Sequence, residues 1–309
     1  MEVGKHDASP VSLSAWIEAA RPRTLPLSLS SIVLGSCLAA ADGECRISVV
    51  ILAAATTLLL QILSNFANDY GDFVNGKDAV GRVGPRRMMQ SGIIMPRSMV
   101  KALTVLVCLT LATGTALILV GLSGSARADM VVYFLLGVCA IVAALKYTVG
   151  RNPYGYRGFG DLFVFVFFGL VGTVGTYYLH THHFRYEVVL PAASIGLLSV
   201  GVLNINNLRD EKSDRLAKKR TLVIILGSRR ARLYHVGLVA AALALGLVYT
   251  ILNLHTWYQF VFVLPVPILL KNASAVLRNT NPVDLTSELK RLSLATLLFA
   301  FAFGLGAIA

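Results

Sequence analysis

The sequence predicts an all-α membrane protein with about nine transmembrane helices. Of its 309 residues, 56% are hydrophobic and only 14% are charged, which leaves too little polar surface to cover a water-soluble globule of this size. Apolar runs of about 18 or more residues recur along the chain, each long enough to cross a hydrocarbon core of about 30 Å as a helix. No stretch remains for a soluble domain, so we expect residues 1–309 to form a single transmembrane domain.

The apolar runs define the expected helices in order. They cover about residues 24–41, 47–67, 102–121, 130–149, 161–179, 188–207, 233–253, 257–271 and 291–309. The eighth run is short and contains Pro265 and Pro267. Because proline removes a backbone hydrogen bond within a helix and bends it, we expect this helix to be kinked.

The basic residues indicate the orientation of the chain. If the N-terminus is cytoplasmic, 25 of the 28 Lys and Arg residues lie on the cytoplasmic side, and only Arg46, Arg127 and Arg185 lie outside. Membrane proteins retain basic residues in this way, so the net charge of +12 does not indicate a nucleic-acid partner. We expect a multi-pass protein of the cell inner membrane with a cytoplasmic N-terminus and its C-terminus outside. The two long connections, residues 68–101 and 208–232, then both face the cytoplasm.

The segment before the first span, residues 1–23, has an amphipathic pattern. Its apolar residues lie at helical spacing and are followed by two basic residues: Leu13, Trp16, Ile17, Ala20, Arg21 and Arg23. The pattern is typical of a helix that lies on the cytoplasmic leaflet. A frayed terminus is the alternative.

Acidic residues are concentrated in the two long connections. Six of the sixteen acidic residues lie there: Asp69, Asp72, Asp78, Asp210, Glu211 and Asp214. Positions three or four apart share one face of a helix, so Asp69 with Asp72, and Asp210 with Asp214, can present converging carboxylates. Such carboxylates repel one another unless a cation holds them.

Oxygen ligands without nearby Cys or His favour a hard ion. Mg²⁺ characteristically binds one or two carboxylates while a substrate phosphate completes its shell. We therefore expect Asp69, Asp72, Asp210 and Asp214 to be metal ligands, with two Mg²⁺ ions bridging a diphosphate. The alternative is that these aspartates only cap helix ends and balance neighbouring Lys and Arg residues.

Asparagines and basic residues accompany both clusters. The asparagines are Asn65, Asn68, Asn206 and Asn207, and the basic residues expected to bind phosphate are Arg86, Arg87, Arg209, Lys219 and Arg220. Each cluster has an asparagine four residues before its first aspartate, a weak repeat that indicates two similar four-helix halves plus a ninth helix. The carboxamides add ligands, hold the aspartates or satisfy backbone groups. Arginine forks match phosphate oxygens, although basic residues also determine topology and contact lipid headgroups.

A third cytoplasmic patch follows the fourth span and is rich in Gly, Tyr and Arg. We expect Lys146 and Arg151 to act in catalysis, and Tyr147, Tyr154 and Arg157 to bind an acidic aromatic substrate. The alternative is that the tyrosines only anchor the chain at the membrane interface.

These motifs resemble those of the UbiA superfamily of intramembrane aromatic prenyltransferases. The first motif is similar to Asn-Asp-x-x-Asp-x-x-x-Asp at Asn68, Asp69 and Asp72, but Gly76 takes the last position and Asp78 arrives two residues later. The second, Asp210-x-x-x-Asp214 followed by Lys-Arg-Thr-Leu, shows no departure. Val-Gly-Pro-Arg-Arg at 83–87 and Asn-Pro-Tyr-Gly-Tyr-Arg-Gly at 152–158 look like the 1,4-dihydroxy-2-naphthoate polyprenyltransferase branch. The likeness covers nearly the whole chain.

The resemblance implies helices around a central cavity and a reaction at its mouth. A polyprenyl group would pass from polyprenyl diphosphate to 1,4-dihydroxy-2-naphthoate with loss of CO₂, giving demethylmenaquinone for menaquinone synthesis, and Asp78 would also contact substrate. The prenyl tail would occupy a groove open to the bilayer and lined by Phe163, Phe165, Phe167 and Phe168. The alternative is that these phenylalanines belong to a helix that only faces lipid.

Other functions remain open at this point. A different aromatic acceptor, such as 4-hydroxybenzoate or homogentisate, is one. An ion-coupled transporter is another, although transporters place ionisable residues near the bilayer midplane, whereas these acidic residues follow the ends of spans. The sequence indicates no protein partner.

Overall fold

The computed structural model describes residues 11–77, 83–84 and 87–309, and within these ranges it contains helices and no strand. Two predicted site residues, Asp78 and Arg86, lie outside the described residues. The elements are α1 (Leu13–Ala20), η1 (Pro22–Thr24), α2 (Leu25–Ala41), α3 (Ile47–Val74), α4 (Pro96–Gly121), α5 (Arg127–Lys146), η2 (Tyr154–Arg157), α6 (Gly160–Val164), η3 (Phe165–Val171), α7 (Gly172–Thr181), η4 (Tyr186–Val188), α8 (Val189–Arg209), α9 (Glu211–Leu216), α10 (Leu222–Leu226), α11 (Ser228–Leu252), η5 (Trp257–Val263), α12 (Val266–Arg278), η6 (Pro282–Asp284) and α13 (Leu285–Ile308).

Nine helical segments in the described part of the chain are long and apolar enough to cross a membrane. Several segments combine short elements: α6, η3 and α7 form one span, and η5 and α12 form another. The prediction of an all-α, multi-pass membrane protein with nine spans is therefore confirmed.

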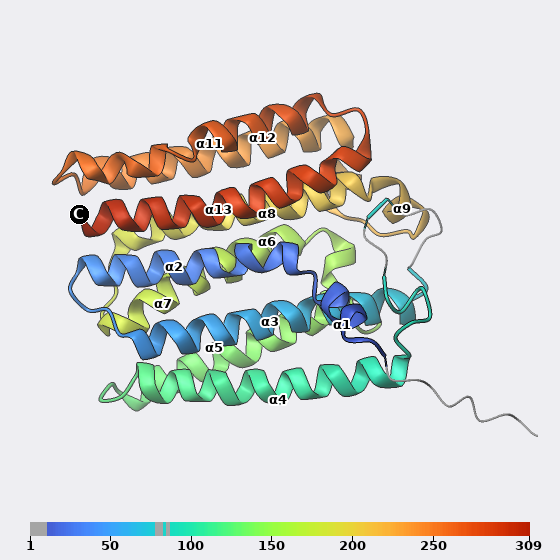
Figure 1. The fold of residues 1–309 in the computed structure, drawn as a ribbon, viewed down its shortest axis with the longest axis horizontal. Helices are drawn as coiled ribbons and strands as arrows, with labels where there is room; N and C mark the ends of the chain where they lie inside the picture. The colour runs from blue at the N-terminus through green and yellow to red at the C-terminus, as the bar shows by residue number, and fades with distance from the viewer. Residues whose placement is uncertain (1–10, 78–82, 85–86) are drawn as a thin grey trace, which may run out of the picture.

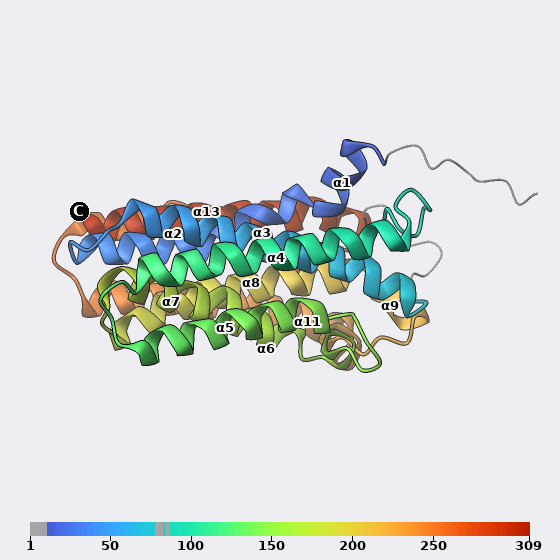
Figure 2. The same ribbon diagram turned by 90° about the horizontal axis from the view of Figure 1, so that it is seen from below.

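The helices lie side by side along the long axis of the molecule (Figure 1). The ends of α3 and α8 that carry the aspartates lie together with α1 and α9 at one end, here called the acidic end, and the C-terminus lies at the opposite end (Figures 1 and 2). Helix α3 packs against α2, α4 and α5, and α8 packs against η3 and α11. Helix α13 contacts both α2 and α8. The last span therefore joins the helices packed around α3 to those packed around α8.

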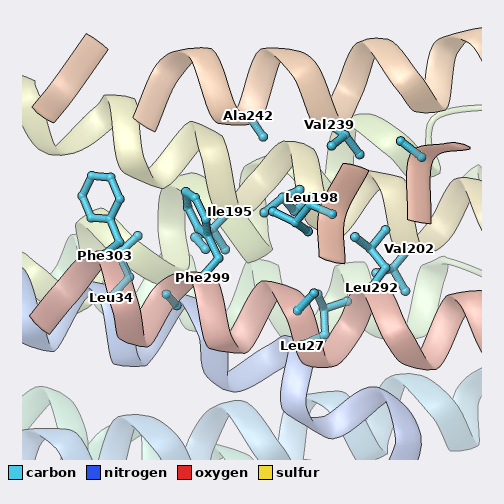
Figure 3. Close-up of a cluster of buried hydrophobic side chains, with 14 of the residues drawn as sticks. Leu27, Leu34, Ile195, Leu198, Val202, Val239, Ala242, Leu292, Phe299 and Phe303 are labelled. Carbon is cyan, nitrogen blue, oxygen red and sulfur yellow. The ribbon is translucent and has the colours of Figure 1, made fainter. Parts of the chain in front are cut away.

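The main hydrophobic core surrounds α8. Figure 3 shows Leu34, Ile195, Leu198, Phe299 and Phe303 between α2, α8 and α13, and all five are buried. Glycines bring α8 close to η3: a Cβ added at Gly169 would lie 2.6 Å from the Cα of Gly196. Small residues allow such close helix packing in membranes. This packing holds α8 and thereby positions the second aspartate motif at its end.

The two long connections differ from the sequence prediction. Helix α3 continues to Val74 and α4 already begins at Pro96, so Asp69 and Asp72 lie on a helix and not in a loop spanning 68–101. Residues 208–232 likewise contain the short helices α9 and α10 and the start of α11. The apolar run marks where lipid contact ends, whereas a helix continues as long as its polar side chains find partners inside the protein.

Two smaller predictions concern the eighth span and the N-terminal segment. The break between η5 and α12 falls at Pro265, as expected for a kinked helix. Of residues 1–23, those from 11 onward are described, and α1 ends at Ala20, followed by Arg21 with a left-handed φ of 52°. Trp16 packs on Phe66 with ring centroids 5.4 Å apart, while Leu13 is exposed.

Candidate active site

The acidic end brings the two aspartate motifs to the mouth of one cavity. Asn65, Asp69 and Asp72 lie on one face of α3 and are buried, as the helical spacing predicts. Asp210 ends α8, and the backbone N–H of Asp214 donates to its carbonyl over 2.9 Å, which turns the chain into α9. The structure therefore gathers the motifs from helices that are more than a hundred residues apart.

The cavity has a volume of about 390 Å³ and extends from the acidic end into the helix bundle. At its mouth it is lined by predicted site residues: Asn65, Asn68, Asp72, Arg87, Tyr147, Tyr154, Asn206, Asn207, Asp210, Asp214 and Lys219. Deeper, it reaches apolar residues such as Leu117 and Leu179 near the opposite end. Asp69 is only 2% exposed and contacts the cavity-lining Arg21.

Basic residues from distant segments hold the first motif. Arg21 donates to Asp69 Oδ1, and the Arg87 guanidinium lies 4.0 Å from Asp69 and is paired with Asp72. Asp72 also accepts hydrogen bonds from the Tyr156 hydroxyl and from Lys219 Nζ, the latter over 2.9 Å. Four separate segments thus converge on one carboxylate pair.

Lys219 links the two motifs. Its Nζ lies 2.9 Å from Asp72 and 3.5 Å from Asp214, and it sits 5.1 Å above the centre of the Tyr156 ring. The two connections are also joined by Lys77, whose Nζ donates to the carbonyl of Ala217 over 2.7 Å. A diphosphate between the motifs would therefore meet a lysine already placed between them.

Among the contacts that the structure describes, those of the Asp210 carboxylate come from its own neighbour. Arg209 Nε donates to Asp210 Oδ1 over 2.8 Å, and its Nη2 reaches Asp210 Oδ2 over 2.9 Å and Asn206 Oδ1 over 2.7 Å. The chain at Gly84 covers this group, because a Cβ there would lie 2.9 Å from Arg209 Nη2. A residue with a side chain at this position would displace the arginine.

The tyrosine patch forms part of the cavity wall. Tyr147 and Tyr154 meet edge to face with centroids 5.4 Å apart, and Tyr154 stacks on Phe163 at 4.0 Å. Burial raises the pKa of Tyr147 and Tyr154, and burial followed by the nearby Asp72 charge raises that of Tyr156. All three hydroxyls therefore stay neutral and can donate hydrogen bonds at physiological pH.

Four predicted site residues lie away from the cavity. Lys146, Arg151, Arg157 and Arg220 are exposed and do not line it. Only the backbone of Arg220 is engaged there, through its N–H donated to the Tyr156 carbonyl over 2.9 Å. The roles predicted for these four side chains remain predictions.

Sequence reasoning missed two residues that line the cavity, Arg21 and Tyr156. Arg21 lies 48 positions before Asp69, and nothing in its local sequence points to that carboxylate. Tyr156 was one of several tyrosines in its patch, and only the fold shows that its hydroxyl reaches Asp72.

The donor set fits a hard divalent cation. Within the described ranges no group of three or more His, Cys, Asp and Glu side chains forms a closed metal cage. Mg²⁺ does not require one, because it usually takes one or two carboxylates and completes its shell with water and substrate phosphates. Carboxylate and carboxamide oxygens at the mouth meet that requirement, with Asp72, Asp210 and Asp214 all facing the cavity.

The sequence pattern of the UbiA prenyltransferase family matches residues 28–295. The chain belongs to this family. It is 44% identical over 292 residues to the 1,4-dihydroxy-2-naphthoate octaprenyltransferase of Escherichia coli, covering 94% of each chain. It is 37% identical over 300 residues to the Mycobacterium tuberculosis protein of the same name, covering 96% of this chain and 98% of the other. The resemblance inferred from the motifs is confirmed.

Solved structures of UbiA homologues have the same fold. The apo structure of a UbiA homologue from Aeropyrum pernix superposes with a TM-score of 0.66 at 18% identity, covering 91% of this chain and 96% of the other. The structure of a UbiA homologue from Archaeoglobus fulgidus bound to GPP and Mg²⁺ gives a TM-score of 0.64 at 13% identity, covering 94% and 99%. The UbiA family member described here is thus a multi-pass membrane prenyltransferase.

Proposed function

We propose that the protein transfers a polyprenyl group from its diphosphate to 1,4-dihydroxy-2-naphthoate in menaquinone biosynthesis. The observation that carries this proposal is the meeting of two carboxylate pairs and their cations at the mouth of a cavity whose deeper part is apolar. The names of the relatives from Escherichia coli and Mycobacterium tuberculosis support this acceptor. Residues 1–309 then act as one transmembrane prenyltransferase domain.

The acidic end binds the diphosphate. Lys219, Arg87 and Arg21 each line the cavity and contact a motif carboxylate, and they supply positive charge where the leaving pyrophosphate gathers negative charge. The Tyr156 hydroxyl donates to Asp72 and fixes the orientation of that carboxylate. These groups hold the diphosphate so that its first prenyl carbon points into the bundle.

Asp69, Asp72, Asp210 and Asp214 would hold two Mg²⁺ ions together with the diphosphate oxygens, with Asn68 and Asn207 as neighbouring carboxamides. Bound Mg²⁺ neutralises the phosphate oxygens and makes pyrophosphate a better leaving group. The homologue with bound GPP and Mg²⁺ supports a divalent ion in this family.

The apolar part of the cavity accommodates the prenyl chain. Phe163, Phe167 and Phe168 line it, whereas Phe165 packs against Gly196 on α8. An apolar wall excludes water, which is a competing nucleophile for an allylic cation. Three of the four phenylalanines predicted to line the prenyl groove therefore face the cavity.

In the prenyl transfer, the bond between the first prenyl carbon and the diphosphate oxygen breaks. A new bond forms between that carbon and the naphthalene ring. Pyrophosphate departs with the electrons of the broken bond, and the ring carboxylate departs as CO₂. The immediate product is the quinol of demethylmenaquinone. The tyrosines and Phe163 at the mouth provide aromatic surface against which the flat acceptor can pack.

The protein lies in the inner membrane with its acidic end and N-terminus in the cytoplasm, as the distribution of basic residues indicates. Helix α2 has 17 residues and is about 26 Å long, nearly enough to cross the hydrocarbon core by itself. Helix α1 is then free to lie on the cytoplasmic leaflet with Leu13 and Ile17 in contact with lipid.

The test is prenyl transfer by the purified protein in detergent. It is offered 1,4-dihydroxy-2-naphthoate or 4-hydroxybenzoate with a polyprenyl diphosphate, with Mg²⁺ or with EDTA. We expect product and CO₂ only from the naphthoate and only with Mg²⁺. Transfer to the benzoate instead would show that the acceptor is 4-hydroxybenzoate. Transfer in EDTA would refute the metal requirement.

A further inference from the structure

Below the acidic end, η1, α2 and α3 contribute hydroxyl and amide side chains to the cavity lining, here called the polar wall: Thr24, Ser28, Ser31, Thr57, Gln61 and Ser64. Apolar residues of the same helices, such as Leu27, Ile32 and Leu60, lie among them, whereas the lining residues of α5 and η3 are mainly apolar or aromatic. A prenyl chain makes no hydrogen bonds, so the polar wall offers it groups that are costly to cover. The polar wall points to a second kind of ligand.

The Gln61 amide is weakly held within this wall. Its Nε2 donates to Thr24 Oγ1 and to Asn65 Oδ1, each over 3.5 Å, which is beyond the usual length of a hydrogen bond. Its Oε1 is buried and has no partner among the residues that the structure describes. Buried polar atoms without a partner are rare in native proteins and call for a functional explanation. The terminal amide torsion is soft, so a small rotation presents the oxygen to the cavity.

The neighbouring Ser28 hydroxyl has only acceptor capacity left. Ser28 Oγ donates its single hydrogen to the Leu25 carbonyl over 2.8 Å, so it can only accept a further hydrogen bond. Thr24 Oγ1 donates to the Arg21 carbonyl over 2.9 Å and already accepts from Gln61 Nε2 and Asn65 Nδ2, so it is fully used. Together with Gln61 Oε1, this part of the wall is complementary to a ligand that donates hydrogen bonds, as a phenolic hydroxyl does.

The depth of Gln61 suits an aromatic acceptor. It lies eleven residues before Asp72 on α3, which is about 16 Å along the helix axis. A diphosphate at the motifs occupies the part of this distance nearest Asp72, and the part nearest Gln61 is left for a flat ring. Across the cavity, a Cβ added at Gly137 would meet no described atom within 4 Å, so α5 leaves room there.

We propose that Gln61, with Ser28, forms the subsite for the hydroxyl-bearing ring of the acceptor, and that Gln61 accepts a hydrogen bond from its distal phenolic hydroxyl. This inference rests on the proposed function and names how the same site selects its substrate. A phenol held by acceptors keeps its electron density on the ring, which favours attack on an allylic cation. Gln61 is then a specificity-determining residue.

The test compares two naphthoates that differ by one hydroxyl. The KM for 1,4-dihydroxy-2-naphthoate is measured at saturating polyprenyl diphosphate, and 1-hydroxy-2-naphthoate is used as a competitive inhibitor. In Gln61→Leu we expect the KM to rise about 10- to 100-fold, because the hydroxyl loses its partner, while the inhibition constant changes less than about twofold. Gln61→Glu, which keeps an acceptor, is expected to retain more affinity than Gln61→Leu.

The control is Thr104→Val, which alters an exposed residue of α4 that does not line the cavity and is expected to leave both constants unchanged. An equal rise in the KM and the inhibition constant would overturn the proposal, since it would indicate a general distortion. A rise confined to the KM of the polyprenyl diphosphate would also overturn it, placing Gln61 on the prenyl path. If the wild type fails to prenylate the naphthoate, the proposed function fails. If it succeeds and Gln61→Leu behaves like wild type, only the subsite fails.

Discussion

The two aspartate motifs look similar in sequence but are held in different ways. The first depends on distant segments: Arg21, Arg87, Tyr156 and Lys219 all reach Asp69 or Asp72. The second has its own arginine one residue away, and it shares Lys219 with the first. The first motif acquires its geometry only when the whole bundle has assembled, whereas the described arginine contact of the second lies within one turn of chain.

This difference matters because charges are costly to bury unless they are paired. Asp69 and Asp72 are 2% and 1% exposed, so their partners determine whether they can remain charged. The same partners also line the cavity, where we propose that the leaving group binds. Residues that hold the first motif are therefore expected to influence both structure and catalysis.

The largest effect is expected for Asp72→Asn, which removes the charge on which three segments converge. We expect kcat/KM for prenyl transfer to fall at least about 1,000-fold, because a preorganised electrostatic group is lost. The measurement is product formation at saturating Mg²⁺. Asp284→Asn, at an exposed position in η6, serves as the control and should retain wild-type activity. Less than about a tenfold loss in Asp72→Asn would show that the first motif is not essential.

The next effect is expected at Lys219, the residue shared by the two motifs. Lys219→Met should lower kcat/KM about 100-fold and raise the KM for the polyprenyl diphosphate, while Lys219→Arg should recover part of the loss, because an arginine also binds phosphate. The exposed Lys212 provides the matched control, Lys212→Met. Equal activity in Lys219→Met and Lys212→Met would show that Lys219 does not link the two motifs in catalysis.

A smaller effect is expected for Tyr156→Phe, which deletes only the hydroxyl that donates to Asp72. We expect activity to fall about five- to tenfold, in line with about 1 kcal/mol for one hydrogen bond. Since burial and the Asp72 charge raise the pKa of Tyr156, its hydroxyl stays protonated, and the ratio of wild-type to variant activity should be constant from about pH 6 to 9. A ratio that collapses toward one as the pH rises would show that the hydroxyl ionises within this range.

The smallest effect on activity is expected for Asn65→Ala. Asn65 Nδ2 donates to the Ala20 carbonyl at the end of α1 over 2.8 Å, so it attaches the segment that carries Arg21. We expect a stability loss of about 1 kcal/mol and a few-fold loss of activity, measured by thermal unfolding in detergent and by prenyl transfer. Asn152→Ala, at an exposed loop position, should change neither. A large loss of turnover at unchanged stability would instead indicate that Asn65 contacts the metal or substrate.

Most of the fold could be predicted from the sequence. The nine spans follow from local composition, because the thickness of the bilayer sets the length of an apolar helix. The motif spacing predicted that Asp69 and Asp72 share a helix face, and the resemblance to the UbiA family supplied the chemistry. Helix ends were less predictable, since α3 continues for about two turns beyond its apolar run.

The sequence by itself therefore determined the fold class, the two motifs and the family. Only the tertiary structure decided which side chains serve the motifs: Arg21 and Tyr156 line the cavity, whereas Lys146 and Arg151 do not. It also decided that Gln61 lines the cavity with its Oε1 buried and without a described partner. The physical reason is that hydropathy and helical spacing are properties of neighbouring residues, while an ion pair depends on side chains that are brought together only by helix packing.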